Sequence, residues 1–477
     1  MITYLCVLGE NSPHVAIGAL PDEILLKIFD FCRLAAVQSY ECLRPWSKMW
    51  RKLVHVCQRW RYVVFSSPIS LDLRLYCTDG TSVREMLDVW PPFPIEIHSS
   101  SLGDNTMAAL GHRDRICEIS LHLTDSKYER LATVMQKPFP VLTALHLSTS
   151  LHEHVPVLSD TFLGGSTPRL RSLRLEDLTF PTLPQFLLSC NDLSELQLLR
   201  MSDIGYNSPE AIVTGLSALS RLTHLNIELG QSGTIGRPPP PLTRALLPTL
   251  TQFEFRGANE YLEDLLAQID TPQLEGLRIV FDQHVFDIQQ VISHSRTLGP
   301  FDCVDVTFSL YSVAIQLSQS EGTSPYKTLH LGLRENAPGR QVSSMAQICT
   351  QFSSLLSRVT KLNIGNDTGS EIAMAFLESD NSYLEELMDN PEWLVLFRPF
   401  TAVQTVRFFG KLQPYIVSSL RLGGHAGQSV TEVLLPELQR LYLYGGHCRD
   451  ELEEETIELF VAARQHSDYP VTVHRLP

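Results

Sequence analysis

The chain is poor in positive charge and has no long apolar run. Its 477 residues include 38 lysines and arginines against 53 aspartates and glutamates, which gives a formal net charge of −15 at pH 7. Binding to nucleic acid or to an anionic membrane surface is therefore not expected, because both depend on positive charge that faces phosphate. No apolar run approaches the roughly 20 residues that cross a bilayer, and no basic residue precedes the short apolar opening, so we expect neither a membrane anchor nor a signal peptide.

Closely spaced cysteines are also missing. The ten cysteines stand singly along the chain, without the spacing of metal sites or redox motifs. We interpret them as small buried hydrophobic residues in a reducing compartment, which predicts a protein of the cytoplasm or the nucleus.

The motifs of common enzyme classes do not occur in the sequence. It has no phosphate-binding glycine loop with lysine, no GxSxG and no HExxH. His152 and His154 flank Glu153, but without further ligands at a recognisable spacing we expect a surface loop there and not zinc; residues 445–448 are expected to form a turn. We predict no catalytic residue, no cofactor and no metal, and a hydrolase that uses scattered histidines stays open as an alternative.

The sequence predicts two amphipathic helical segments near the N-terminus. Pro21 suits the first turn of a helix, and Asp22 and Glu23 place negative charge near the positive end of its dipole. Apolar residues then follow at helical spacing from 24 to 29, and again from 46 to 64. About 65 residues cannot bury so many large side chains internally, because a domain of this size buries only about 60% of its unfolded surface. We expect part of this apolar surface to meet a partner.

These two segments, Leu20 to Phe29 and Trp50 to Arg61, together resemble an F-box. Their continuation at 65–75 and 90–97 resembles F-box proteins common in mushroom-forming fungi. The stretch from Arg33 to Met49 departs from the family, because it is longer and more aromatic than the usual connection. The resemblance implies that the segment docks onto a Skp-family adaptor and through it a cullin scaffold. The residues it implies for this contact are Leu20, Pro21, Ile24, Leu25, Ile28, Leu53, Val56, Cys57 and Trp60.

Beyond this segment, one short pattern recurs: an apolar residue, two variable ones, an apolar one, a variable one and another apolar one. The clear copies are Leu142/Leu145/Leu147, Leu170/Leu173/Leu175, Leu193/Leu196/Leu198, Leu222/Leu225/Ile227, Leu250/Phe253/Phe255 and Leu274/Leu277/Ile279. The weaker copies are Ile116/Ile119/Leu121, Phe301/Val304/Val306, Tyr326/Leu329/Leu331, Val359/Leu362/Ile364, Val403/Val406/Phe408 and Leu438/Leu441/Leu443. From Ile116 to Tyr326 the copies recur about every 23 to 29 residues, inside the range of leucine-rich repeats.

The pattern predicts an α/β fold. Each copy would form a short strand with its apolar side inward, and the residues between copies would return along a helix or an irregular turn. Stacked units would make a parallel sheet with helices on its other side, as an irregular leucine-rich-repeat solenoid with the sheet on its concave side. After Val359 the spacing becomes irregular. An acidic helix at 450–460 and a strand at 471–473 are expected to cap the end.

We therefore expect four parts. They are an N-terminal extension at 1–17, an F-box domain at 18–66, a connecting or N-terminal capping segment at 67–110, and the repeat domain at 111–477. The proline-rich stretch at 231–241 is expected to be a stiff loop, and recruitment of a partner with an aromatic groove is the alternative.

Within each predicted strand, the residue between the last two apolar positions should point away from the core. Solenoids of this type present such a surface to partners, so we predict a target-binding face of mixed charge that suits a folded protein or a modified peptide. Its residues would be His146, Arg174, Gln197, Asn226, Glu254, Arg278, Asp305, His330, Asn363, Arg407 and Tyr442.

The resemblance implies a non-catalytic substrate-recognition subunit of a Skp/cullin/F-box ubiquitin ligase. In this hypothesis the F-box holds the adaptor, the repeat domain holds an unknown target, and the target is marked for ubiquitin-dependent degradation. The alternative is a leucine-rich-repeat scaffold for protein interactions that has no role in ubiquitin transfer.

Overall fold

The computed structural model describes residues 20–37, 53–66, 73–123, 128–150, 155–201, 208–230, 244–282, 288–319, 327–366, 391–409, 417, 420, 433–444 and 451–476. Several features that the sequence singles out lie outside these residues, namely the extension at 1–17, most of the 33–49 stretch, His152 to His154, the proline-rich stretch, Tyr326 and residues 445–448. The chain divides into two compact units, Met1–Leu151 and His152–Pro477. The boundaries expected at 66 and 110 both fall inside the first unit.

The first unit begins with two helices that contact each other. Helix α1 spans Asp22–Val37 and has both acidic residues in its first turn, as the sequence predicts. Helix α3 spans Gln58–Ser66. The Arg59 guanidinium on α3 donates a hydrogen bond of 2.7 Å to the Asp22 carboxylate and another to the Leu20 carbonyl. The rings of Phe29 and Trp60 meet edge to face, with their centroids 5.0 Å apart. Polar and aromatic contacts therefore join the start of α1 to α3.

The rest of the first unit is a parallel sheet with short helices between its strands. The elements are β1 (Arg74–Tyr76), α4 (Val83–Val89), β2 (Ile95–Ser99), α5 (Asp104–Leu110), β3 (Ile116–Leu123), α6 (Tyr128–Met135) and β4 (Ala144–Thr149). The strands lie side by side in chain order, and each pair is parallel. Strands β1 and β2 lie in the segment that was expected to be only a connection or a cap. The repeat pattern did not identify them, because Ser70 and Pro92 stand where an apolar residue would precede Leu73 and Ile95 by three positions.

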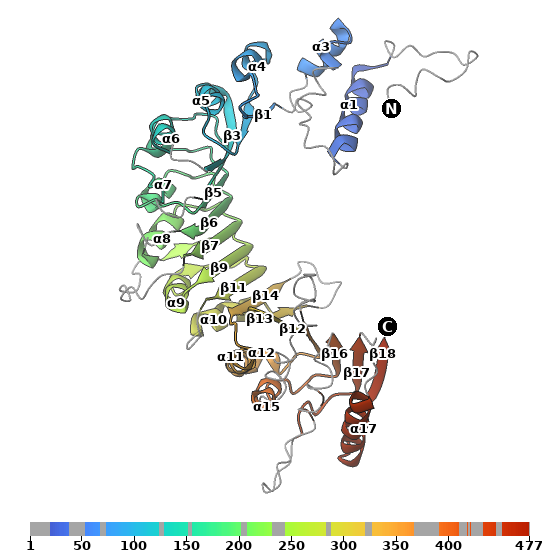
Figure 1. Cartoon of the computed structure of the whole chain (residues 1–477). Helices are drawn as coiled ribbons and strands as arrows, with labels where there is room; N and C mark the ends of the chain where they lie inside the picture. The colour runs from blue at the N-terminus through green and yellow to red at the C-terminus, as the bar shows by residue number, and fades with distance from the viewer. Residues whose placement is uncertain are drawn as a thin grey trace, which may run out of the picture. The chain divides into compact units, whose positions relative to one another are not determined.

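The second unit has a larger, mostly parallel sheet of twelve strands (Figure 1). The order across it is β5-β6-β7-β9-β11-β14-β13-β12-β15-β16-β17-β18. The strands are β5 (Ser172–Glu176), β6 (Glu195–Met201), β7 (His224–Leu229), β9 (Gln252–Gly257), β11 (Gly276–Phe281), β12 (Cys303–Ser309), β13 (Ser312–Ser318), β14 (Thr328–Arg334), β15 (Lys361–Asn366), β16 (Thr405–Phe409), β17 (Arg440–Tyr444) and β18 (Thr472–Leu476). Two short strands, β8 (Ala245–Leu246) and β10 (Ile269–Asp270), form a separate parallel pair.

Helices and short turns connect these strands. They include α7 (Leu183–Leu187), α8 (Pro209–Leu216), α9 (Asn259–Leu266), α10 (Gln289–Thr297), α11 (Pro338–Gln351), α12 (Ser353–Leu356), α15 (Glu392–Phe397) and α17 (Glu451–His466). Helices α7 to α10 follow one another along one side of the strands from β5 to β11 (Figure 1). Among the described residues, no helix is long and apolar enough to cross a membrane.

The alternation predicted for each repeat is confirmed by burial. In β5, for example, Leu173 and Leu175 are fully buried while Ser172, Arg174 and Glu176 are only half-buried. Every clear copy places its last two apolar residues on a strand and buries them. Because successive side chains on a strand point to opposite sides, the polar residues gather on the other face of the sheet. We call this polar side the open face.

Hydroxyl groups just before the strands link successive repeats. The Thr223 hydroxyl donates a hydrogen bond of 2.9 Å to the carbonyl of Ser194, and the Thr251 hydroxyl donates one of 3.1 Å to the carbonyl of Thr223. Thr360 makes the same kind of bond to Asp302. Each bond joins equivalent positions of neighbouring strands, so these side chains help to hold the repeats in register.

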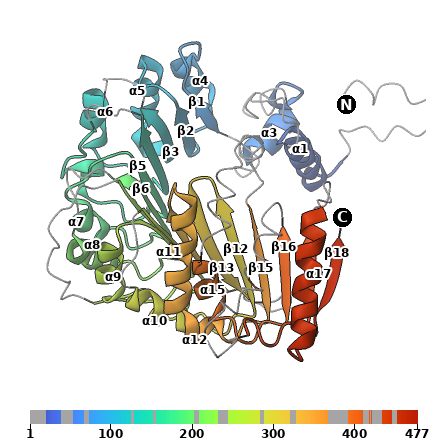
Figure 2. The ribbon, with the colours of Figure 1, turned by 60° about the horizontal axis from the view of Figure 1, so that its bottom comes forward.

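The expectation of parallel strands in simple chain order is wrong around β12 to β14. Strand β13 is antiparallel to both of its neighbours, β12 is parallel to β15, and β14 is parallel to β11. Figure 2 shows β13 and β12 beside β15 and β16. Only two residues separate Ser309 from Ser312, and a connection that short can join only antiparallel strands. Strand β13 was not predicted although Leu310, Val313 and Ile315 fit the repeat spacing, because this copy begins only nine residues after Phe301, far inside the expected period.

Candidate functional site

The predicted target-binding residues of the second unit form one continuous row on the open face. Backbone pairing places them opposite one another, strand after strand, in the order Arg174, Gln197, Asn226, Glu254, Arg278, His330, Gln316, Asp305, Asn363, Arg407, Tyr442 and His474. All the residues predicted from this unit belong to the row, and each is half-buried or exposed. Whether the row binds a target stays a prediction.

Sequence reasoning missed two members of this row. Gln316 lies on β13 and pairs with both His330 and Asp305, so it fills the place between them. His474 lies on β18 opposite Tyr442, and the two rings stack with their centroids 4.8 Å apart. Gln316 stands between two buried apolar residues, a signal that could have revealed it. The strand that carries His474 was expected, but its register against β17 was not.

Neighbouring members of the row hold one another through polar contacts. Arg174 donates a hydrogen bond of 3.1 Å to Gln197, and Asn363 donates one of 2.7 Å to Asp305. Farther along, the Arg407 guanidinium lies over the Tyr442 ring, 5.7 Å from its centroid. The row therefore presents a pre-ordered strip of donors, acceptors and rings, with no single sign of charge.

A trough lies on the open face where the parallel strands meet the β12 to β14 meander. Its volume is about 560 Å³. The residues that line it come from β7, β9, β11, β12, β13 and β14 and include Asn226, Glu254, Arg278, Thr307, His330 and Arg334. Arg256, which also lines the trough, pairs with Glu228 at 2.8 Å and with Asp282 at 3.3 Å. Its walls thus offer both signs of charge to a bound chain.

His330 is the most perturbed titratable group of the trough. Burial, and then the positive charge of Arg278, lower the pKa of the His330 imidazole to about 4. The ring is therefore neutral at physiological pH and keeps one nitrogen as a hydrogen-bond acceptor. Its Nδ1 atom is buried and has no hydrogen-bond partner among the described residues. A donor group of a bound target could satisfy that atom.

His146, the remaining predicted member, lies on β4 in the first unit. It pairs with Ser120 on β3, which in turn lies opposite His98 on β2, and His98 lies opposite Tyr76 on β1. The hydroxyl of Ser120 is 3.5 Å from the Nδ1 atom of His146. The first unit therefore has a row of its own, rich in histidine.

The residues implied for adaptor binding fall into three groups by exposure. Leu25 and Leu53 are buried, whereas Leu20 and Trp60 are half-buried. The exposed members are Pro21, Ile24, Ile28, Val56 and Cys57. Only the last group is positioned to touch a partner directly, while Leu25 and Leu53 support it from the core.

Among the described residues, one cluster of side chains could hold a metal ion. It consists of Glu96, His98 and Glu118 in the first unit. His152 and His154 lie outside the described part of the chain. Comparison with protein-family models found no family that matches this chain, and comparison with curated proteins found no significant match.

Proposed function

We propose that the chain is a substrate-recognition subunit of a Skp/cullin/F-box ubiquitin ligase. In this proposal α1 and α3 bind the Skp-family adaptor, and the open face of an irregular leucine-rich-repeat body binds the target. The chain itself catalyses nothing. Its work is to raise the local concentration of the target near the ubiquitin-charged enzyme.

The observation that carries the proposal is that α1 has two apolar faces. One face holds Leu25 and Phe29, which are 0% and 3% exposed. The other holds Ile24, Ile28 and Phe31, which are 39%, 41% and 75% exposed. These three residues are spaced four and three apart, so they form one stripe along the helix. Exposed apolar stripes of this kind are typical of interaction surfaces, and the F-box resemblance supports a Skp-family adaptor as the partner.

Binding to a purified Skp-family adaptor tests the first half. We expect a stable complex with the full chain, and we expect it to be lost when Ile24 and Ile28 are both changed to aspartate. The matched control is Glu23→Gln, because Glu23 is exposed on the same helix and lies neither three nor four residues from any member of the stripe. Absence of a complex with the unchanged chain, or binding that survives the double substitution, would contradict the proposal.

A test for ubiquitin transfer requires cells. Removal of the chain should stabilise specific proteins, and a version that lacks residues 20–65 should accumulate bound to them. Unchanged protein turnover together with intact adaptor binding would favour the alternative, a scaffold without a role in ubiquitin transfer. The continuous polar row supports that alternative equally well, because its geometry does not depend on α1 and α3.

A further inference from the structure

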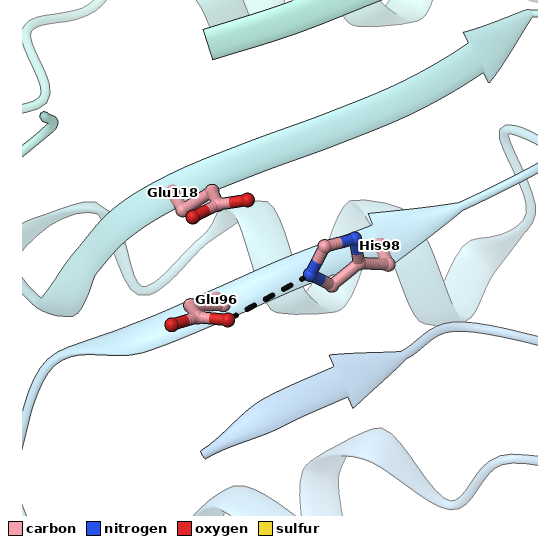
Figure 3. A group of neighbouring side chains, drawn as sticks. All are labelled: Glu96, His98 and Glu118. Atoms are coloured by element: carbon pink, nitrogen blue, oxygen red, sulfur yellow. Dashed lines mark ion pairs between the residues drawn. The ribbon is translucent and has the colours of Figure 1, made fainter. Parts of the chain in front are cut away.

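Three side chains with metal-binding groups converge on one face of the sheet in the first unit. Glu96 and His98 are two residues apart on β2, so both point to the same side, and Glu118 comes from the neighbouring strand β3 (Figure 3). One ligand atom from each residue lies within 4.8 Å of the other two. All three side chains are half-buried.

An irregularity in strand pairing brings Glu118 into this group. Ile95 pairs with Ile116, but Glu96 pairs with Glu118, so Cys117 is an extra residue on β3. Without this bulge Glu118 would lie opposite Ile97, on the buried apolar side, because a shift of one residue turns a side chain to the other face. The bulge therefore sets two carboxylates directly opposite each other, and bulges often re-aim side chains at functional sites.

Neighbouring residues hold two of the three groups in place. The ring of Tyr76 stacks on that of His98, with the centroids 5.2 Å apart. The Arg74 guanidinium donates a hydrogen bond of 2.7 Å to Oε2 of Glu96, which leaves Oε1 for another partner. Such supporting contacts are typical of metal ligands, whose orientation must be fixed before the ion arrives.

The imidazole nitrogen that faces the carboxylates has no satisfactory partner. The Nε2 atom of His98 lies 3.8 Å from Oε2 of Glu96, too far for a hydrogen bond. It is shielded from solvent and has no hydrogen-bond partner among the described residues. A shielded nitrogen of this kind, with an oxygen of each of two carboxylates within 4.8 Å, can serve as a metal ligand.

The charges of the group also favour a cation. Arg74 pairs with Glu96 at 2.7 Å, whereas no ion pair of Glu118 with a lysine or arginine is found among the described residues. A divalent ion between the two carboxylates would supply the missing positive charge.

We propose that Glu96, His98 and Glu118 bind a divalent transition-metal ion of the Zn²⁺ class through one imidazole nitrogen and two carboxylate oxygens. Imidazole suits zinc, nickel, cobalt and copper, whereas Mg²⁺ and Ca²⁺ prefer oxygen ligands alone. Ligand bonds of about 2.0 to 2.2 Å require the three side chains to close inward from their present separation. Three protein ligands leave a coordination position for water or for a group of a bound protein, and this site does not depend on the proposed ligase function.

Titration of the metal-stripped full chain without a histidine tag tests this inference. We expect isothermal calorimetry to show Zn²⁺ binding at one site that Mg²⁺ does not displace, and Zn²⁺ to raise the unfolding temperature. Both effects should be lost in His98→Ala. Glu118→Gln keeps the shape of the side chain and should weaken binding at least about tenfold.

His146→Ala is the matched control, because it removes an open-face histidine of the same unit that lies outside the group. It should bind Zn²⁺ as the unchanged chain does. Retention of the Zn²⁺ site in both His98→Ala and Glu118→Gln, or no Zn²⁺ binding by the folded unchanged chain, would overturn the inference. Circular dichroism of each variant separates lost binding from lost folding.

Discussion

The guanidinium of Arg464 on α17 donates a hydrogen bond of 3.1 Å to the carbonyl of Leu435, in the turn that leads into β17. Leu435 is buried and has a φ of 51°, in the left-handed region that costs a residue with a Cβ atom about 1 to 2 kcal/mol. Arg464 also donates to the carbonyls of Leu434, Leu438 and Tyr469. The buried arginine therefore holds a strained turn against the C-terminal helix.

We predict that Arg464→Met lowers the free energy of unfolding by about 2 to 4 kcal/mol, because it leaves several buried carbonyls without a donor. Arg440→Met, at an exposed position of β17, is the control and should change it by less than about 0.5 kcal/mol. Urea denaturation measures both values. Equal stability of the two variants would show that water satisfies the carbonyls instead.

Gly365 on β15 is a position where a side chain has no room. A Cβ atom there would lie 2.8 Å from Cβ of Phe409 and 3.2 Å from its carbonyl oxygen, on the paired strand β16. We predict that Gly365→Ala destabilises the protein by about 1 to 3 kcal/mol, since backbone must move to admit the methyl group. Gly80→Ala is the control, because nothing lies within 4 Å of its Cβ position. Thermal denaturation of the two variants should therefore differ.

The lowered pKa of His330 predicts a stability change with pH. The unfolded chain binds a proton near pH 6.5, whereas the folded chain binds it only near pH 4. Between these values the unfolded state holds more protons, so the contribution of His330 to stability is complete above pH 6.5 and is lost as pH falls toward 4. His330→Gln should lose less stability than the unchanged chain between pH 7.5 and pH 4.5.

Urea midpoints at the two pH values measure this difference. The control is His224→Gln, which removes an exposed imidazole from a nearby strand of the sheet. It should lose as much stability between pH 7.5 and pH 4.5 as the unchanged chain. If His330→Gln loses as much stability on acidification as the unchanged chain, the burial of this imidazole does not contribute to the pH dependence of the free energy of unfolding.

Phe31 provides a sharper test of the adaptor surface than the residues that the family resemblance implies. Its side chain is 75% exposed on α1, in line with Ile24 and Ile28. We predict that Phe31→Asp weakens adaptor binding by about tenfold or more while helix content stays unchanged, because an apolar anchor of this size contributes on the order of 1.5 to 3 kcal/mol when buried. Phe29→Asp should instead unfold the helix pair, since Phe29 packs on Trp60. Adaptor affinity and circular dichroism together distinguish the two effects.

Sequence reasoning succeeded where a local rule decides the structure. The apolar alternation of Leu173 and Leu175 predicts both the strand and the direction of Arg174 between them, and the same rule holds from β5 to β17. Asp22 and Glu23 mark the start of α1 for a similarly local reason, the field at the end of a helix. The helix at the C-terminus and the strand after it also follow from local patterns.

The same reasoning failed where distant residues decide. The two-residue turn that reverses β13 is local, but the pairing of β12 with β15 and of β14 with β11 depends on distant residues, and the repeat pattern contains no record of pairing. The bulge at Cys117 is invisible in the sequence because it exists only relative to β2. Ile24 and Leu25 are adjacent apolar residues on α1, and only packing between elements determines that Leu25 is buried and Ile24 is exposed.

The sequence by itself determined the period of the repeats, the inward and outward faces of each strand, and the position of the first helix, because those follow from side-chain spacing along one element. Only the tertiary structure decided that the outward residues form one row with Gln316 and His474, that Glu118 turns toward Glu96 and His98, and that α1 keeps an exposed apolar stripe. These features depend on register and packing between elements, and the spacing within a single element does not specify either.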